Sequence, residues 1–318
     1  MSDKNTLQKK LIKELNENYL DKYADILSKK ALNTINIKIL KPEKKKKNKE
    51  TTSKSKIKSI LNALAEIPKH NNIIGIDNLD TGISKIGGQP DLPENFSWPY
   101  REKRPLSFLA QINLNDTKDL DIEKLLPESG MLYFFYDTEE MPWGINKKDK
   151  SSWKIYYIKE IDNLIKTHHP DYKNNDYYYE ACKVIFNNYL SLPGYENISF
   201  DRSIKLNDED EESYIEYIID PLKQNTYTCL LGYPITIQND EMEIECAKIN
   251  LETKPSKSKE YKKEIQKASK EWILLFQLDS ETNAKMMWGD CGKLYFWIKK
   301  EELKNKNFDN VWMILQCS

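Results

Sequence analysis

The stretch WILLFQLDS (272–280) repeats the pattern of an earlier stretch, LSFLAQINL (106–114). When Gln277 is aligned with Gln111, apolar residues match on both sides of the two amides. Successive side chains of a β-strand point to opposite faces, so we expect Phe108 to share a face with Ala110, and Gln111 to share the other face with its next-but-one neighbours. We therefore expect two equivalent strands, each with a polar amide at its centre.

The segments around these two strands recur in the same order. A Gly-x-Pro turn precedes each strand, and a glycine-led aromatic strand and then a Trp-led strand follow it. The copies are the turns at 88–90 and 232–234, the strands that begin at Gly130 and Gly292, and those that begin at Trp153 and Trp312. Four matches in one order predict an internal duplication.

The fold class that this pattern predicts is α+β. We expect a duplicated, mostly antiparallel β unit with flanking helices and internal pseudo-symmetry. Residues 83–318 would form one domain from two repeats, 83–160 and 229–318, which a helical insertion joins. Residues 1–82 would be an N-terminal helical extension.

Apolar spacing predicts the remaining elements. Leucines and Tyr23 recur at helical steps over residues 7–27, and isoleucines alternate over 35–39 as in a short strand. Helical spacing over 178–189, before Pro193, predicts a further helix. The acidic run 208–212 suits the start of a helix, because carboxylates favour helix N-termini.

Two lysine-rich segments look like additions to the repeated unit. Residues 41–58 contain nine lysines and no aliphatic residue except Ile57, so we expect a flexible, solvated loop that trypsin cleaves first. In the second segment, 254–270, Tyr261, Ile265 and Ala268 have helical spacing.

The composition narrows the class of protein. The 318 residues carry 49 basic and 50 acidic side chains, and only three of the basic ones are arginines, so nucleic acid is not an expected partner. The five cysteines include no CxxC pair, and the first ten residues have no apolar core. No apolar run is long enough for a membrane span, so we expect a cytoplasmic protein without a membrane anchor.

Familiar catalytic and cofactor motifs are missing from the sequence. There is no GxxxxGK[ST] and no GxGxxG, and His168-His169 lacks the partners that a zinc site requires. Asp80-Thr81-Gly82 matches the loop of aspartic proteases, but the other half has no second copy, so we interpret it as a turn. We expect no metal, no cofactor and no catalytic residue.

The polar residues of the repeated strands form the candidate ligand site. A buried amide needs a specific hydrogen-bond partner, which could be a ligand or a neighbouring loop. If a ligand binds, we expect it where the two halves meet. The candidate residues are Gln111, Asn113, Gln277, Asp279, Trp288 and Asp290. The structural alternative is that both glutamines are fully buried ties to the backbone.

Long strings in the sequence also resemble a known family. KIGGQPDLP (85–93), LPESGMLYFFYD (126–137), LLGYPITIQ (230–238) and MMWGDCGKLYFWI (286–298) resemble the YwqG-like family of bacterial proteins, over about residues 83–318. The resemblance implies an α+β fold. It implies no reaction and no catalytic residue, because the family has no known function.

Two functions of different classes remain open. The first is a non-enzymatic binding module for a protein partner or a small ligand, since tyrosine and tryptophan often anchor interfaces. The second is a hydrolase that would use carboxylates in a cleft between the repeats, chosen from Asp137, Glu139, Asp279 and Asp290. We expect the binding module rather than the enzyme.

Overall fold

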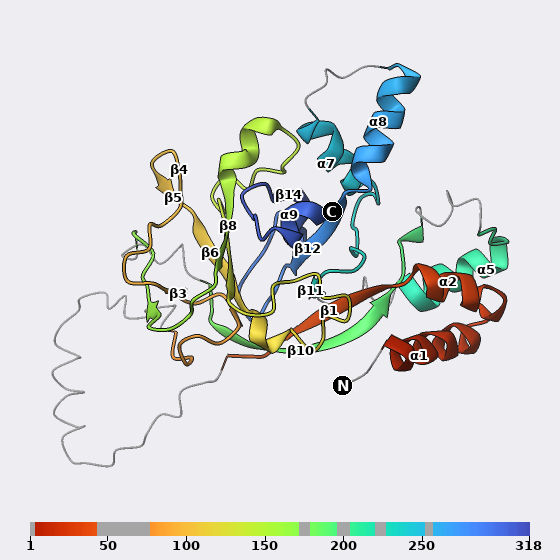
Figure 1. The fold of residues 1–318 in the computed structure, drawn as a ribbon, viewed down its shortest axis with the longest axis horizontal. Coiled ribbons are helices and arrows are strands. Elements are labelled where there is room, and N and C mark those ends of the chain that lie inside the picture. Colours follow the sequence, from red (N-terminus) through yellow and green to blue (C-terminus); the bar gives the residue numbers. More distant parts are fainter. Residues whose placement is uncertain (1–3, 43–76, 172–178, 196–203, 220–226, 252–256) are drawn as a thin grey trace, which may run out of the picture.

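A ten-stranded antiparallel sheet forms the centre of the computed structural model, which describes residues 4–42, 77–171, 179–195, 204–219, 227–251 and 257–318 (Figure 1). In spatial order its strands are β14 (Trp312–Gln316), β13 (Lys293–Lys299), β12 (Trp272–Asp279), β11 (Thr228–Leu230), β1 (Leu32–Ile39), β10 (Cys182–Ser191), β2 (Lys85–Ile86), β6 (Ser107–Asn113), β7 (Met131–Tyr136) and β8 (Trp153–Ile158). With flanking helices, this architecture confirms the predicted α+β class.

Shorter elements surround the sheet. Two small two-stranded sheets pair β3 (Asp91–Leu92) with β9 (Ile165–Lys166) and β4 (Tyr100–Arg101) with β5 (Arg104–Pro105). The helices are α1 (Lys4–Glu17), α2 (Ala24–Lys30), α5 (Asp208–Ser213), α7 (Met242–Asn250), α8 (Lys259–Ser269) and α9 (Lys300–Lys304). The shorter turns are the 3₁₀ helices η1 (Asp21–Tyr23), η2 (Leu114–Asp116) and η3 (Lys147–Ser152) and the π-helix η5 (Tyr214–Ile219).

Two sets of four strands flank the central pair β1 and β10. The set β2-β6-β7-β8 and the set β11-β12-β13-β14 have the same internal order, and in each the central glutamine lies opposite a tyrosine. Gln111 pairs with Tyr133, and Gln277 pairs with Tyr295. These matches support the predicted duplication, which stays a prediction until the two strand sets are superposed.

A β-bulge changes the predicted face of Phe108. The register of β6 shifts between Phe108 and Ala110, and that of β12 shifts between Leu274 and Phe276, the aligned positions. A bulge interrupts the strict alternation of side chains. Phe108 therefore packs with Tyr133 on one face of the sheet, while Ala110 belongs to the main core on the other face. The prediction that Phe108 shares a face with Ala110 is wrong.

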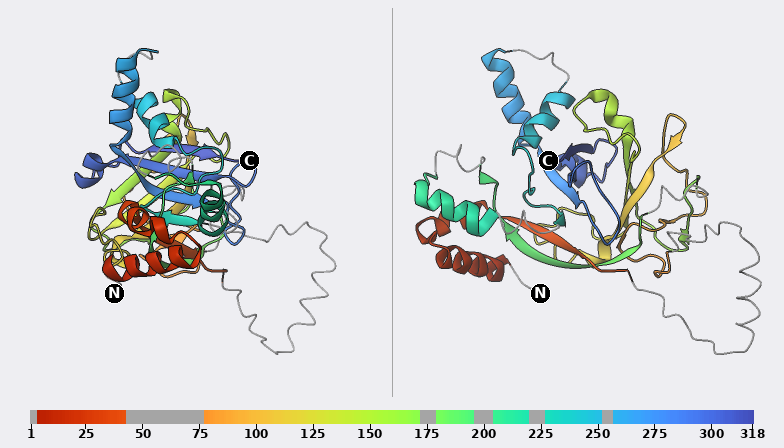
Figure 2. Two further views of the ribbon diagram at one scale, coloured as in Figure 1. Left: turned by 90° about the vertical axis from the view of Figure 1, so that its right-hand side faces the viewer. Right: turned by 180° about the vertical axis from the view of Figure 1, so that it is seen from behind.

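The N-terminal segment is partly helical and partly sheet. The predicted helix over 7–27 is broken into α1 and α2, because Tyr19 has a φ of 62°, outside the right-handed helical region. The predicted strand over 35–39 is confirmed as part of β1, which lies between β11 and β10. Figure 2 shows β1 running from the small helices into the main sheet.

The predicted helix over 178–189 is wrong, since residues 182–191 form β10. This strand pairs with the full length of β1, from Ser191 opposite Leu32 to Val184 opposite Ile39. Val184, Ile185 and Phe186 are β-branched or aromatic residues, which favour strands, and this pairing outweighs the helical spacing.

The other local predictions have mixed outcomes. The acidic run begins α5, where the Asn207 side chain accepts a hydrogen bond from the Asp210 amide, and the helical spacing in the second lysine-rich segment is confirmed as α8. Thr81 and Gly82 lie in a turn. Residues 43–58 lie outside the described residues. Among the helices that are described, none is long and apolar enough to cross a membrane.

The two edge strands of the sheet, β8 and β14, are in contact where each begins. The Trp153 and Trp312 rings, at the starts of β8 and β14, lie edge to face with centroids 5.0 Å apart. Trp153 Nε1 donates to the Val311 carbonyl and Trp312 Nε1 donates to the Gly144 carbonyl, each at 2.8 Å. We refer to this junction as the edge seam.

Candidate functional site

Gln111 holds the loop that follows the first Gly-x-Pro turn. The Asp91 amide donates to Gln111 Oε1 at 2.8 Å, and Gln111 Nε2 donates to the Ile83 carbonyl at 2.8 Å. The Tyr133 hydroxyl donates to the Asp91 carbonyl. The amide is fully buried, so these bonds satisfy a group that would otherwise be costly to bury.

Gln277 holds the second loop in the same way. The Ile235 amide donates to Gln277 Oε1 at 2.9 Å, and Gln277 Nε2 donates to the Tyr227 carbonyl at 2.7 Å. The Tyr295 hydroxyl donates to the Ile235 carbonyl at 2.8 Å. Asp91 and Ile235 each lie three residues after the glycine of their Gly-x-Pro turn, so the side chains of Gln111 and Gln277 bind equivalent positions in the two loops. This geometry fits the alternative in which both glutamines are fully buried ties to the backbone.

Asn113 and Asp279 occupy matched positions but differ in burial. Asn113 is half-buried and donates to the Gly82 carbonyl at 2.8 Å. Asp279 is buried, accepts from the Tyr227 amide at 2.7 Å and lies 3.3 Å from Lys293 Nζ. Burial raises the pKa of Asp279 to about 6, although Lys293 opposes the shift.

Trp288 forms a hydrogen bond with Asp279, whereas Asp290 lies on the surface. The fully buried Trp288 indole donates to the Asp279 carbonyl at 3.2 Å. Asp290 is exposed in the turn that follows. The structure thus brings together Gln277, Asp279 and Trp288, while Gln111 and Asn113 contact the loop of their own half. A ligand role for these six residues stays a prediction.

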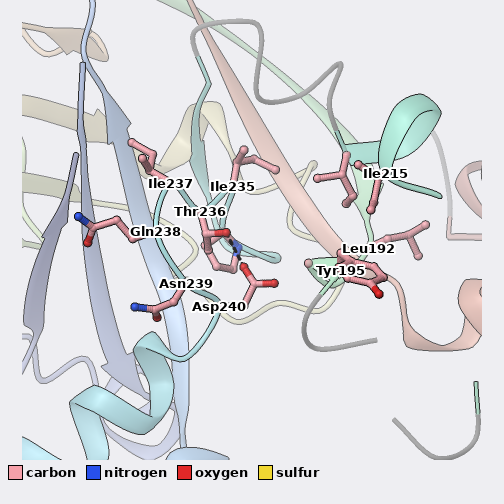
Figure 3. Close-up of a pocket in the computed structure, with 12 residues that line it drawn as sticks. Leu192, Tyr195, Ile215, Ile235, Thr236, Ile237, Gln238, Asn239 and Asp240 are labelled. Carbon is pink, nitrogen blue, oxygen red and sulfur yellow. Dashed lines mark hydrogen bonds between the residues drawn. The ribbon is translucent and has the colours of Figure 1, made fainter. Parts of the chain in front are cut away.

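A pocket of about 170 Å³ lies beside the loop that Gln277 holds (Figure 3). Its lining is formed by Leu192, Gly194, Tyr195, Ile215, Ile219, Pro234, Ile235, Thr236, Ile237, Gln238, Asn239 and Asp240. Figure 3 shows residues 235–240 on one side of the hollow and Leu192, Tyr195 and Ile215 on the other. We call it the loop pocket.

Main-chain ties fix the first wall of the loop pocket. In addition to the bond from Ile235 to Gln277, the amides of Ile237 and Gln238 donate to Gln316 Oε1 at 3.0 and 3.2 Å. Gln238 Nε2 donates to the Cys317 carbonyl at 2.9 Å. The sequence analysis missed Gln316, although it lies in the repeated Trp-led strand, because its partners are about eighty residues away in sequence.

A π-helical turn forms part of the opposite wall. Ile215 and Ile219 belong to η5, whose first residue, Tyr214, is buried and donates its hydroxyl to the Pro193 carbonyl at 2.7 Å. That bond fixes the chain just before Gly194 and Tyr195. π-Helical turns are rare and often occur at functional sites, so this wall favours a functional role for the loop pocket.

The loop pocket has an apolar body and one acidic corner. Among the lining residues that the structure describes, Asp240 is the single carboxylate, and none is a lysine, arginine or histidine. Asp240 is buried and accepts a hydrogen bond from the Thr236 hydroxyl, drawn in Figure 3. Burial, together with the nearby charge of Asp240, raises the pKa of Glu243 to about 7. The pocket therefore favours a group that is positively charged or donates hydrogen bonds.

The carboxylates considered for hydrolysis have other partners. Arg101 Nη1 and Arg104 Nη2 both lie 2.7 Å from Asp137 Oδ2, and these two guanidinium groups hold the pKa of Asp137 below its ordinary value. Asp279 is paired with Lys293. Glu139 and Asp290 are exposed. The carboxylates of Asp137 and Asp279 are thus already engaged in ion pairs.

A buried ionic cluster lies in the first half. Lys85 Nζ lies 2.5 Å from Asp77 Oδ2 and 3.1 Å from Asp91 Oδ1, and all three side chains are fully buried. Lys166 lies 3.6 Å from Asp91. At the matched positions of the second half, Cys229 lies opposite Gln277 as Lys85 lies opposite Gln111, and Ile235 replaces Asp91. The two positions that carry charged side chains in the first half therefore carry uncharged side chains in the second half.

The described residues contain no group of three or more histidine, cysteine, aspartate or glutamate side chains that could hold a metal ion. His168 Nδ1 lies 2.8 Å from Gln89 Nε2, beside the Lys85 cluster. His169 is buried, and burial lowers its pKa.

These observations define an antiparallel α+β protein with two equivalent loop ties and a small apolar pocket. A family model described as Domain of unknown function (DUF1963) matches residues 84–317, and the chain belongs to this family. The match confirms the resemblance drawn from the sequence strings. No curated protein matches the chain.

Proposed function

We propose that this protein is a binding module whose loop pocket receives an aliphatic group that ends in an ammonium or guanidinium. The observation that carries this proposal is the composition of the described part of the lining, in which six apolar side chains surround one buried carboxylate, Asp240. An amine on a short aliphatic chain matches both parts, since the chain buries apolar surface and the amine meets the carboxylate.

Such a group could belong to a free amine or to a lysine or arginine side chain of a partner protein. Both sources share the same recognition chemistry. The loop wall is held by main-chain ties to Gln277 and Gln316, so the pocket is largely formed before a ligand arrives. Preorganisation of this kind reduces the entropic cost of binding.

Calorimetric titration with n-butylammonium tests the proposal directly. We expect saturable binding, no binding of the isosteric neutral butanol, and at least about tenfold weaker binding for Asp240→Asn, because a charged hydrogen bond is lost. Glu241→Gln is the matched control, since Glu241 is exposed and lies outside the lining. Equal affinity for butanol, or equal loss in both variants, would contradict the proposal.

The alternative is hydrolysis by Asp137, Glu139, Asp279 or Asp290. Its strongest feature is the raised pKa of Asp279, about 6, which suits an acid–base group. The ion pairs of Asp137 and Asp279 weigh against it. Turnover of an ester or glycoside substrate that is lost in Asp279→Asn, with the fold intact, would favour the enzyme.

A further inference from the structure

A second hollow, of about 530 Å³, lies at the edge seam, far in sequence from the residues of the loop pocket. Its lining is formed by Pro99, Tyr100, Leu106, Lys148, Lys150, Ser151, Trp153, Lys154, Tyr156 and Asp309. All of these belong to the first half except Asp309, which precedes β14. We call this hollow the seam pocket.

The seam pocket carries more positive than negative charge. Its described lining contains three lysines and one carboxylate, and that carboxylate, Asp309, lies 2.5 Å from Lys154 Nζ. Within the described part of the chain, no carboxylate lies within 4.0 Å of the Lys148 or Lys150 ammonium. An anion could therefore bind here without displacing an existing ion pair.

Lys150 is the most unusual of these lysines. Its ammonium donates to the Val311 carbonyl at 2.7 Å and lies over the Trp153 ring, 5.5 Å from the centroid. Burial, reinforced by the neighbouring charge of Lys154 and opposed by Asp309, lowers the pKa of Lys150 to about 8. A single carbonyl leaves an ammonium with donors to spare, since it has three N–H bonds.

Aromatic side chains form the rest of the wall. Tyr100 is 49% exposed, which is high for so large an apolar ring, and Tyr156 lies beneath the Lys154 ammonium at 5.6 Å. Aromatic rings that line a hollow favour flat apolar ligands, because offset stacking adds to the burial of surface.

We propose that the seam pocket binds an aromatic ligand that carries one carboxylate or phosphate group. The anionic group lies between Lys148 and Lys150, and the ring packs against Tyr100 and Tyr156. This inference is independent of the loop pocket, whose described lining residues include no cationic side chain.

Titration of the full chain with phenyl phosphate and with benzoate tests this inference. We expect at least one of them to bind, and the tighter one identifies the anion. We expect benzamide, which is neutral, and inorganic phosphate, which has no ring, to bind at least about tenfold more weakly. Binding of inorganic phosphate as tight as that of phenyl phosphate would overturn the aromatic part of the proposal.

Two variants and a control locate the site. Lys150→Met and the more exposed Lys148→Met should each weaken binding at least about tenfold, through loss of a charged hydrogen bond. Lys147→Met is the matched control, because Lys147 is exposed on the same 3₁₀ helix but does not line the hollow. Lys148→Met keeps the test valid if Lys150→Met fails to fold. Equal loss in the control, or no binding of either anion by the folded protein, would overturn the proposal.

Discussion

Gln277 illustrates how a single amide can hold a loop. Its three neighbours, the Ile235 amide, the Tyr227 carbonyl and the Tyr295 side chain, come from three different segments. Removal of the amide leaves buried backbone groups unpaired, so we expect Gln277→Ala to lower the free energy of unfolding by about 1–3 kcal/mol. We expect Gln111→Ala to lower the free energy of unfolding by a similar amount. Urea unfolding measures both, with the exposed Gln266→Ala as control. A loss below about 0.5 kcal/mol in both would contradict the tie.

Asp279 gives a prediction about pH. Its pKa is raised in the folded protein to about 6 from an ordinary 3.8, so the folded state holds this proton more tightly than the unfolded state does. The contribution of Asp279 to stability is therefore most favourable below pH 4 and is lost as pH rises through 6, by about 3 kcal/mol. Asp279→Asn should remove this component when unfolding is measured from pH 4 to 7. An unchanged pH profile would show that Asp279 titrates normally.

At the scale of elements, the Lys85 cluster is the clearest difference between the halves. Among the described residues, Lys85→Met would leave Lys166 as the one cation near the buried Asp77 and Asp91, so we expect a loss of about 3–5 kcal/mol. The double variant with Asp91→Asn should be less destabilised than the sum of the single variants. Chemical denaturation of the four proteins in this cycle measures the coupling. Simple additivity would mean that the charges do not interact.

The sequence predicted some elements well and others poorly, for physical reasons. The repeated strands could be recognised because Gln111 and Gln277 stand in matching apolar runs. Residues 178–189 were predicted as a helix, because spacing alone cannot show that β1 will pair with residues 182–191. The break at Tyr19 depends on a positive φ, which its side chain does not signal.

The candidate site was harder to predict than the fold. The sequence analysis singled out the two central glutamines as polar residues that need partners, and both side chains bond to backbone groups. The residues of the loop pocket come from three separate segments, 192–195, 215–219 and 234–240, and no motif connects them. The pairing of Asp240 with Thr236 is a local contact, but its burial depends on the fold.

At the scale of the whole molecule, the edge seam links the two ends of the sheet. Trp153 and Trp312 each donate to a carbonyl from the opposite half, and their rings are in contact. We expect Trp153→Phe and Trp312→Phe each to cost about 1–3 kcal/mol, and their effects to couple by at least about 0.5 kcal/mol. A double-mutant cycle in urea measures this coupling. Independent effects would indicate that the seam is not one cooperative contact.

The central claim is that the loop pocket receives an aliphatic ammonium, and isoleucine methyl NMR tests it most directly. The δ1 methyl groups of Ile215, Ile235 and Ile237 line the pocket, whereas Ile112 lies in the main core outside this lining. On titration with n-butylammonium, we predict saturable shifts of the three pocket methyl signals while the Ile112 signal stays in place. Unmoved pocket signals, or equal shifts throughout the protein, would contradict the account.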